Sequence, residues 1–409
     1  MCTGNDKNRT IIQTIDHYID SGEIAGAGLI IRKGGREALH YNAGYANVEK
    51  GMPVKDNTLF RLASMTKPIT AIAAMQLIEQ GKLDLEAAVA DYLPEFAHMQ
   101  VADKVVGFEL FYAADPDNPM MAKMIQETLD GIHLLPAVKP ITIMDLLNHS
   151  SGLGMGLVSR QPVENCFAST DKLKDRVEKF ARTPLDFEPG TMTGYSAVVG
   201  FDVLGRIIEK VTEMDLHSYM KKYIMEPLDI TDITYVPSQE QKGRLARLYE
   251  YAKGALVDVT ECEPAWQQVN PEVNGYYSGS AGLFGTLADY DKIVQMLANK
   301  GTLHGRQILK MDTIKQMTGV RAHHKKEFLP DSYWGLGMVV FGDHEKTNRG
   351  LARGSYGWSG AYGSHFYIDP VNQLTVTLMA QRSNIGGAFS PVSHALETAV
   401  YKTYIQEEQ

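Results

Sequence analysis

Residues 62–82 read LASMTKPITAIAAMQLIEQGK, and this stretch has the composition of one largely buried helix. Its apolar residues cover most of the helical circumference, which is typical of a helix inside a domain. Gly81 stands where a C-terminal cap is expected. Pro68 fits the first turn, where its missing N–H has no helical partner. These boundaries place Ser64 at the N-terminus of the helix, with Lys67 one turn later on the same face.

Ser64 is therefore expected beside free backbone N–H groups, the positive end of the helix dipole and an amine. Such a setting can activate a serine nucleophile and hold an oxyanion. The Ser-x-x-Lys spacing alone is a weak signal, because it recurs at 169–172 and 218–221. There a helix cap and a solvated helix face are expected. For Ser64, a capping serine with a solvated lysine is the alternative.

Length, charge and cysteine spacing restrict the function. At 409 residues, the chain predicts two domains or one domain with a large insertion. A net charge of −9 without a basic cluster argues against nucleic acid as a partner. Cys2, Cys166 and Cys262 are too widely spaced for a disulfide framework or a zinc site. Neither Gly-x-Gly-x-x-Gly nor His-Glu-x-x-His occurs, so no nucleotide cofactor and no metal are expected.

The location of the protein is predicted from its apolar runs. No run approaches the roughly 20 residues of a membrane span. The first ten residues, MCTGNDKNRT, contain no hydrophobic signal region. A cytoplasmic protein is therefore expected, the alternative being a trimmed exported precursor that begins near Cys2.

Strands are expected near both ends of the chain, so the predicted fold class is α/β (α+β). Helical spacing at 11–19 precedes two strands joined by the turn Lys33-Gly34-Gly35-Arg36. The two strands joined by this turn are expected at 27–32 and 38–45. Further strands are expected at 335–341, 365–368 and 374–379, and helices at 287–299, 312–317 and 391–405. We expect an antiparallel sheet flanked by helices, in a discontinuous domain made of residues 1–83 and 278–409.

Residues 84–277 are expected to form a mostly helical domain inserted into the first one. A strand is expected at 105–112. Helical periodicity is present at 120–129, 141–149, 172–181, 197–211 and 216–225. Thr142 is the expected cap of the second of these helices. A small-molecule cleft is expected where the helices meet the sheet, and the segment 98–139 is hypothesised to be a lid over it.

Candidate partners for the serine lie far along the chain. A Gly-x-Ser-x-Gly elbow is absent, which excludes the usual α/β-hydrolase signature. His149 and His365 are candidate bases, but a helix end and a strand interior favour structural roles. Tyr195, in GTMTGYS at 190–196, can point its phenol into a cleft; the alternative is a core aromatic. The glycine-dense stretch GWSGAYG at 357–363 permits a close ligand approach, or is a tight turn.

Taken together, these stretches resemble the serine β-lactamase and penicillin-binding protein superfamily, and most closely the class C β-lactamases and family VIII carboxylesterases. FRLASMTK at 60–67 is similar to the first motif of that superfamily. Tyr195-Ser196-Ala197 stands in the place of the second motif and Trp358-Ser359-Gly360 in that of the third. Supporting stretches are ITIMDLLNHSSGL at 141–153, FEPG at 187–190 and AGLFGT at 281–286. The likeness spans roughly residues 10 to 400, in the family's motif order.

The resemblance implies a mechanism. Ser64 would attack an acyl carbonyl and form an acyl-enzyme, and Lys67 and Tyr195 would share proton transfer. The tyrosine would act as a phenolate beside the ammonium, which must favour its charged form because a free tyrosine has a pKa near 10. The backbone N–H groups of Ser64 and Ala361 would form the oxyanion hole. Water or an alcohol would then release the acyl group.

Two departures from the family pattern bear on the substrate. The second motif usually ends in asparagine, here Ala197, and the third usually begins with lysine, here Trp358. An alanine offers no side-chain hydrogen bond and a tryptophan no charge, so an anionic amide would be held poorly. Trp358, Tyr362 and residues of the helical part are expected to form a wide apolar acyl pocket, with Ser359 and Gly360 also contacting substrate. Arg353 is a candidate replacement for the lost charge; the alternative is a solvated loop residue.

The predicted function is that of a serine carboxylesterase acting on a small-molecule ester with a short- to medium-chain acyl group. Weak β-lactam hydrolysis is expected as a side activity. The alternatives with the same serine chemistry are a β-lactamase, a D-amino-acid peptidase and an acyltransferase to an alcohol. A non-catalytic sensor that binds β-lactams or acyl groups is the alternative from another class.

Overall fold

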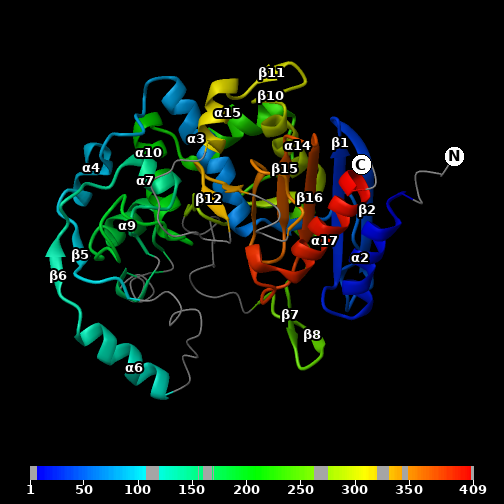
Figure 1. The fold of residues 1–409 in the computed structure, drawn as a ribbon, viewed down its shortest axis with the longest axis horizontal. Coiled ribbons are helices and arrows are strands. Elements are labelled where there is room, and N and C mark those ends of the chain that lie inside the picture. The colour runs from blue at the N-terminus through cyan, green and yellow to red at the C-terminus, as the bar shows by residue number, and fades with distance from the viewer. Residues whose placement is uncertain are drawn as a thin grey trace.

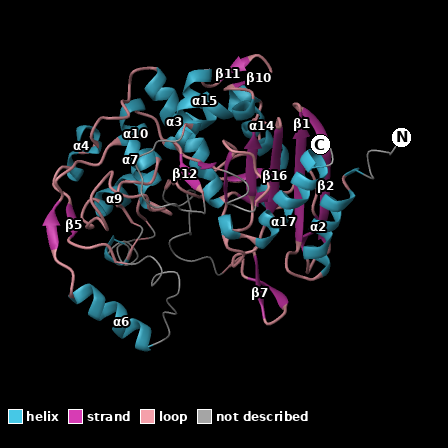
Figure 2. Ribbon diagram, in the orientation of Figure 1, coloured by secondary structure: helices cyan, strands magenta, loops and turns pink. Residues whose placement is uncertain are grey.

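A computed structural model of the chain describes residues 7–106, 119–154, 156–159, 168, 170–261, 275–319, 331–342 and 349–406. Its centre is one eight-stranded antiparallel sheet, in the order β12-β13-β14-β15-β16-β1-β2-β3 (Figures 1 and 2). These strands are β1 (Gly26–Lys33), β2 (Arg36–Asn47), β3 (Met52–Pro53), β12 (Ser332–Trp334), β13 (Val339–Phe341), β14 (Tyr356–Ser359), β15 (His365–Asp369) and β16 (Leu374–Ala380). The predicted antiparallel sheet is confirmed.

Both ends of the chain meet in the middle of this sheet. Strand β1 pairs with β16, so that Ala27 lies opposite Ala380. The turn between β1 and β2 was predicted from Gly34 and Gly35, and both have positive φ, 58° and 76°. Two consecutive residues with positive φ make the turn whose twist suits a two-residue hairpin. Local turn chemistry therefore sets this register, whereas the β1–β16 pairing brings together segments more than 340 residues apart.

Helices cover the sheet. Helix α14 (Leu287–Ala298) packs on β1 and β16, and α2 (Arg9–Asp20) packs with α17 (Pro391–Tyr401) on the front of the sheet in Figure 1. The other elements of these parts of the chain are β4 (Leu59–Arg61), η1 (Ala63–Met65), α3 (Thr66–Glu79), β9 (Phe284–Thr286), β10 (Thr302–Leu303), β11 (Arg306–Gln307), α15 (Met311–Thr318), η5 (Gly387–Phe389) and η6 (Lys402–Gln406).

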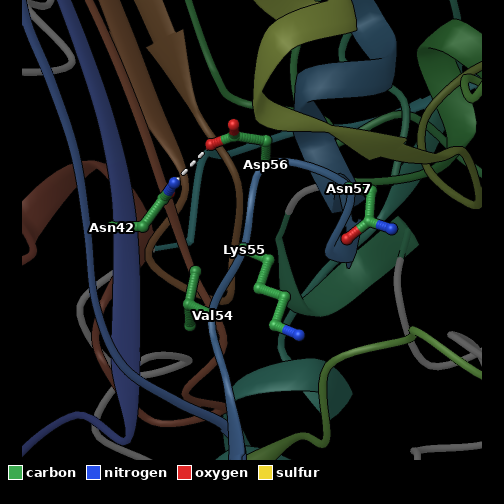
Figure 3. Close-up of a pocket in the computed structure, with 5 residues that line it drawn as sticks. All are labelled: Asn42, Val54, Lys55, Asp56 and Asn57. Carbon is green, nitrogen blue, oxygen red and sulfur yellow. Dashed lines mark hydrogen bonds between the residues drawn. The ribbon is translucent and has the colours of Figure 1, made fainter.

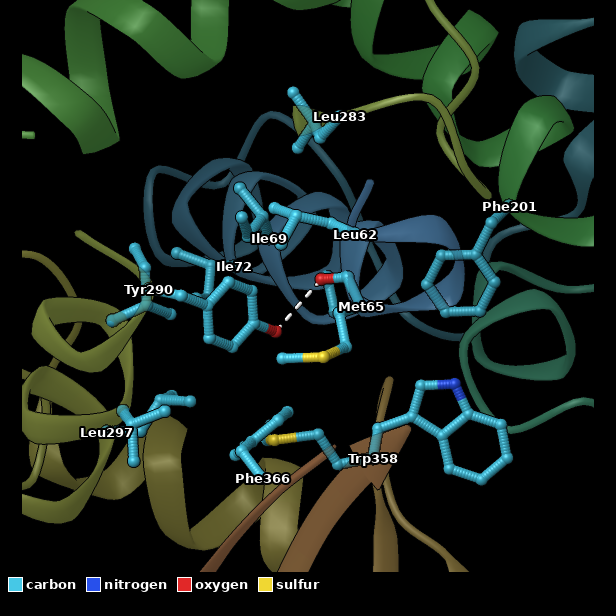
Figure 4. Close-up of a cluster of buried hydrophobic side chains, with 14 of the residues drawn as sticks. Leu62, Met65, Ile69, Ile72, Phe201, Leu283, Tyr290, Leu297, Trp358 and Phe366 are labelled. Carbon is cyan, nitrogen blue, oxygen red and sulfur yellow. Dashed lines mark hydrogen bonds between the residues drawn. The ribbon is translucent and has the colours of Figure 1, made fainter. Parts of the chain in front are cut away.

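Helix α3 is the buried helix expected from the sequence. Every residue from 66 to 77 is buried, and Gly81 follows its last turn with a φ of 68°. Figure 4 shows Met65, Ile69 and Ile72 packed with side chains of α14 and β15. The hydroxyl of Tyr290 donates a hydrogen bond of 2.9 Å to the carbonyl of Met65 in the same cluster. The start of α3 is thus held by the core itself.

One predicted strand is confirmed only at its end, residues 339–341. Residues 335–341 were expected as a single strand, but β12 and β13 pair with each other and residues 335–338 form the turn between them. Gly337 in this turn has a φ of 88°, and a Cβ there would lie 2.3 Å from the Cβ of Ala71 in α3. The glycine therefore allows the turn to lie against the helix.

The described residues between 84 and 277 form mainly helices and two small strand pairs. The elements are α4 (Val89–Tyr92), η2 (Pro94–Phe96), β5 (Gln100–Ala102), α6 (Pro119–Asp130), β6 (Leu134–Pro136), α7 (Ile143–Leu147), α9 (Leu173–Phe180), α10 (Val199–Thr212), α11 (Leu216–Met220), η3 (Lys221–Met225), η4 (Glu226–Leu228), α12 (Gln239–Lys242), β7 (Tyr249–Ala252) and β8 (Ala255–Asp258). The five predicted helices are present, and Thr142 caps α7 by accepting from the N–H of Asp145. The domain boundaries and the lid stay predictions.

Three smaller expectations have outcomes of their own. Most of the strand predicted at 105–112, and Ser169 of the second Ser-x-x-Lys copy, lie outside the described residues. Ser218 lies in the first turn of α11 and donates to the carboxylate of Asp215 at 2.6 Å, so it belongs to a helix start rather than a helix middle. None of the helices in the described ranges is long and apolar enough to cross a membrane.

Candidate active site

The segment that leads into Ser64 is held by backbone pairing. Strand β4 pairs with β9, and the N–H of Leu62 donates to the carbonyl of Leu283 at 2.9 Å. The next residue, Ala63, adopts a φ of 46°, in the left-handed region. That conformation costs a non-glycine residue about 1–2 kcal/mol, so the surrounding structure must enforce it. This strain could not be predicted from the sequence, because alanine has no preference for such a conformation.

Three side chains predicted to act together meet at this turn. The Tyr195 hydroxyl lies 2.8 Å from Ser64 Oγ, and Lys67 Nζ lies 3.4 Å from the same oxygen. Ser64 and Tyr195 are half-buried, whereas Lys67 is fully buried beneath them. The arrangement links a hydroxyl that can reach a ligand to an amine that water does not reach.

The environment of Lys67 was not foreseen from the sequence. Its Nζ donates to the carbonyl oxygens of Ala197 at 2.6 Å and Ser280 at 3.0 Å. Burial lowers the pKa of Lys67 to about 7, although the negative charge of Asp202 partly opposes the change. Near neutral pH the amine is therefore present in both protonation states. The neutral form can act as a base, which a lysine in water cannot do at this pH.

Aromatic rings fix the position of Tyr195, which precedes helix α10. Its ring is stacked on Trp334 of β12, with centroids 5.6 Å apart and planes at 6°. Trp358 of β14 lies against the same ring, with centroids 5.0 Å apart. Trp358 is 4% exposed, so the position that usually holds a lysine here forms an aromatic wall beside the phenol. Trp334 was missed; it lies in β12, for which no strand was predicted.

His149 has the structural role expected from its sequence position. It is buried, and its Nδ1 accepts a hydrogen bond from the N–H of Ser196 at 3.1 Å. Its carbonyl accepts from the N–H of Gly194 at 2.7 Å. Burial, and next the charge of Lys67, lower the pKa of His149 well below its ordinary value. The neutral ring thus holds the loop that presents Tyr195.

The predicted oxyanion-hole groups come from two elements packed against each other. A Cβ on Gly360 would lie 2.6 Å from the carbonyl oxygen of Leu62, so the end of β14 touches the segment before Ser64. Among the residues that the structure describes, no backbone carbonyl accepts a hydrogen bond from the N–H of Ser64 or from that of Ala361. Both donors therefore remain available for a developing negative charge on a substrate oxygen.

Ser359 and His365 belong to a buried polar network behind the third motif. Ser359 Oγ lies 2.8 Å from His365 Nδ1, and His365 Nε2 lies 3.1 Å from a carboxylate oxygen of Glu397. Arg349 binds the same carboxylate with two bonds, of 2.8 and 2.7 Å. Burial raises the pKa of Glu397, but hydrogen bonding from His365 and the charge of Arg349 bring it below its usual range. The Ser359 hydroxyl thus faces His365 in the core.

Tyr362 and Arg353, the other residues predicted near the substrate, differ in their exposure. Tyr362 is 6% exposed, so its ring is mostly covered. Arg353 is exposed in the turn before β14, which agrees with the solvated alternative. A hollow lined by Asn42, Val54, Lys55, Asp56 and Asn57 lies beside β2 (Figure 3) and contains none of the predicted site residues. Within the described ranges, no three His, Cys, Asp or Glu side chains gather in a metal-binding cluster.

Over most of its length, the chain is similar to several known proteins. A model of the beta-lactamase family matches residues 11–391. Esterase EstB of Burkholderia gladioli is 28% identical over 409 residues, covering 94% of this chain and 93% of EstB. The lovastatin esterase of Penicillium rubens is 33% identical over 301 residues, covering 71% of this chain and 68% of the esterase. The solved structure of EstCE1, a hydrolase with promiscuous acyltransferase activity, superposes with a TM-score of 0.77 at 23% identity, covering 97% of this chain and 99% of EstCE1.

Proposed function

The chain belongs to the beta-lactamase family, and on that premise we propose that it is a serine hydrolase that cleaves small carboxylic esters through an acyl-enzyme on Ser64. One observation carries the proposal. A single hydroxyl oxygen, Ser64 Oγ, lies within 2.8 Å of a phenol and 3.4 Å of a buried amine whose pKa is lowered to about 7. This is the setting of a nucleophile with its base.

The two carbonyls around Lys67 support its role as the base. A neutral amine has two N–H groups, and the carbonyl oxygens of Ala197 and Ser280 accept one hydrogen bond each. The third Nζ contact is Ser64 Oγ, so the lone pair of the neutral amine is left for the serine proton. Two backbone acceptors thereby orient a neutral base, and this takes the place of the ammonium–phenolate pair expected from the resemblance.

The reaction follows from these contacts. Ser64 Oγ attacks the ester carbonyl carbon while its proton passes to Lys67 Nζ, directly or through the Tyr195 hydroxyl. The tetrahedral oxyanion is held by the N–H groups of Ser64 and Ala361. The bond to the leaving alcohol breaks as Tyr195 donates a proton to its oxygen, and Lys67 restores the proton of the phenol. Water then repeats the sequence on the acyl-enzyme and releases the acid.

Esters are favoured over anionic amides by the groups around the serine. Trp358 brings an apolar ring rather than a cation to the side of Tyr195, and Ala197 contributes only its backbone carbonyl to Lys67. A substrate carboxylate would lose water there without gaining a charged partner. Two relatives of this chain, EstB and the lovastatin esterase, carry the name esterase, which supports the same choice.

The proposal is tested with p-nitrophenyl butyrate. The wild-type protein should release p-nitrophenol, and Ser64→Ala should not exceed the buffer rate. Ser218→Ala is the matched control, because Ser218 also begins a Ser-x-x-Lys stretch but bonds to Asp215 in a helix start. It should keep full activity. Equal hydrolysis by the wild type and Ser64→Ala, or none by either, would refute the proposal.

The same acyl-enzyme can be discharged by an alcohol. EstCE1, which shares the fold, is described as having acyltransferase activity. The yield of methyl butyrate should therefore be measured with and without added methanol. A rising ester yield at constant p-nitrophenol release would assign transfer as well as hydrolysis. An acyl adduct on Ser64 that is seen by mass spectrometry and never turns over would instead assign a sensor.

A further inference from the structure

A buried carboxylate lies behind the Ser64 site. Asp202, on helix α10, is fully buried. Its Oδ1 accepts from Ser278 Oγ at 2.6 Å and from the N–H of Ser280 at 3.1 Å, and its Oδ2 accepts from the Tyr276 hydroxyl. Three donors are thus directed at a carboxylate that is sealed from the surface. Nothing in the reaction described above uses it directly.

The segment 278–280 connects this carboxylate to the base. Its three carbonyls accept from three different side chains: Tyr235 bonds to Ser278 at 2.6 Å, Thr70 to Gly279 at 2.7 Å and Lys67 to Ser280 at 3.0 Å. Asp202 therefore holds the N–H of Ser280, while the carbonyl of the same residue holds Lys67. A shift of this segment would move one of the two carbonyls that orient the amine.

Close packing makes the connection rigid. A Cβ on Gly279 would lie 2.1 Å from the carbonyl oxygen of Phe201, the residue before Asp202. The segment therefore lies directly against helix α10, and only glycine permits this approach. The hydroxyl of Ser280 also donates to the carbonyl of Val198. Helix α10 and the segment consequently act as one unit against Lys67.

Other charged and titratable groups lie near this unit. Arg176 of α9 lies over the ring of Tyr276, 3.8 Å from its centroid, and its charge acts on Asp202. Tyr235 faces the carboxylate with its pKa raised, first by burial and then by Asp202. On the side of Lys67 lies the neutral ring of His149. The charge of Asp202 acts on Lys67 and favours the protonated amine.

We propose that Asp202 is a positioning residue for the Ser64 reaction. It fixes the carbonyl of Ser280 against Lys67 by holding the N–H of the same residue, and its negative charge favours the protonated amine. The inference rests on the proposed function, in which neutral Lys67 takes the serine proton. It assigns a role to a residue that acts through Lys67 rather than on the substrate.

Two variants separate position from charge. In Asp202→Asn, an amide oxygen placed at Oδ1 keeps the bonds from Ser278 and Ser280, and the amide nitrogen faces the Tyr276 hydroxyl, which can accept. This variant removes the charge and preserves the position. Asp202→Ala removes both. Asp186→Asn is the matched control, because Asp186 is also buried and accepts from three backbone N–H groups, and the Lys67 bonds to Ala197 and Ser280 do not involve it.

The readout is the rate at which a fluorophosphonate labels Ser64, followed by mass spectrometry between pH 5 and pH 9. The acid midpoint of this rate should move down by about one pH unit in Asp202→Asn, as expected for losing one nearby charge. It should not move in Asp186→Asn. Asp202→Ala should react at least roughly tenfold more slowly at every pH, because the base is no longer held in place.

The outcomes distinguish this inference from the proposed function. No labelling of wild-type Ser64 would refute the proposed function. Labelling of the wild type with an unmoved midpoint in Asp202→Asn would refute the assigned role of the charge. Wild-type rates in a folded Asp202→Ala, checked by circular dichroism, would refute the positioning role. If that variant does not fold, Ser278→Ala replaces it, since it removes one bond to Asp202 and leaves the carboxylate in place.

Discussion

Replacing Lys67 by methionine should change how the stability of the protein depends on pH. Lys67 is fully buried, and its pKa falls from 10.5 to about 7 on folding. Between these two values the unfolded chain binds the proton and the folded chain does not. The wild-type free energy of unfolding must therefore rise with pH across this window. The penalty is fully present below pH 7 and is lost above pH 10.5.

The size of the effect follows from the two pKa values. The difference between 10.5 and about 7 corresponds to about 5 kcal/mol. Methionine has a similar length and no charge, so Lys67→Met avoids this cost. It also leaves the carbonyls of Ala197 and Ser280 without their donor, at about 1–3 kcal/mol each. The second cost does not depend on pH. The stability of the variant relative to the wild type should consequently fall by about 1.4 kcal/mol for each pH unit above about 7.5.

Urea unfolding of both proteins at about pH 7.5, 8.5 and 9.5 measures this slope. Groups other than Lys67 titrate in both proteins, so their effects cancel in the difference. Lys315→Met is the control, since Lys315 is largely exposed beside Asp312, and its difference from the wild type should stay flat. Parallel stability curves for the wild type and Lys67→Met would refute the burial argument, and with it the neutral base. Lys67→Met should also lose about 10²–10⁴-fold in ester hydrolysis.

Three further substitutions test the surroundings of the site. Tyr195→Phe keeps the stacking on Trp334 but loses the 2.8 Å contact to Ser64; ester turnover should fall by about a hundredfold with an unchanged melting temperature, and a shifted melting temperature would contradict a purely catalytic role. Glu397→Gln removes the buried negative charge that accepts two bonds from Arg349. Urea unfolding should show a loss of about 3 kcal/mol, and a loss below about 1 kcal/mol would count against the network. Gly337→Ala puts a Cβ 2.3 Å from the Cβ of Ala71. The control is Gly254→Ala, because Gly254 has a similar φ of 83° but open space around it. Gly337→Ala should lose about 1–3 kcal/mol more folding stability than this control, and equal melting temperatures would refute the close packing.

Much of the fold could be predicted because its signals are local. The apolar circumference of 66–77, the cap at Gly81 and the Gly34-Gly35 turn each depend on a few neighbouring residues. The error at 335–341 arose because the local sequence favours a strand, whereas a contact with a distant residue makes its first part a turn. The turn there depends on how Gly337 packs against Ala71, more than 260 residues earlier in the chain.

The site divides in the same way. Ser64, Lys67 and Tyr195 were predicted because each lies in a recognisable motif. Ser280 was missed, because its contribution is a backbone carbonyl that every residue type possesses. Trp334 was missed because nothing near it in the chain relates it to the phenol on which it stacks.

The order of amino acids alone thus indicated a buried helix with a serine at its mouth, an antiparallel sheet, and three residues that we propose to perform acyl transfer. Only the packing of distant segments decided what those residues can do. A lysine in water has a pKa near 10.4. Enclosure by helix α10 and the segment 278–280 lowers the pKa of Lys67 to about 7, because a charged amine removed from water loses more hydration than two carbonyls replace.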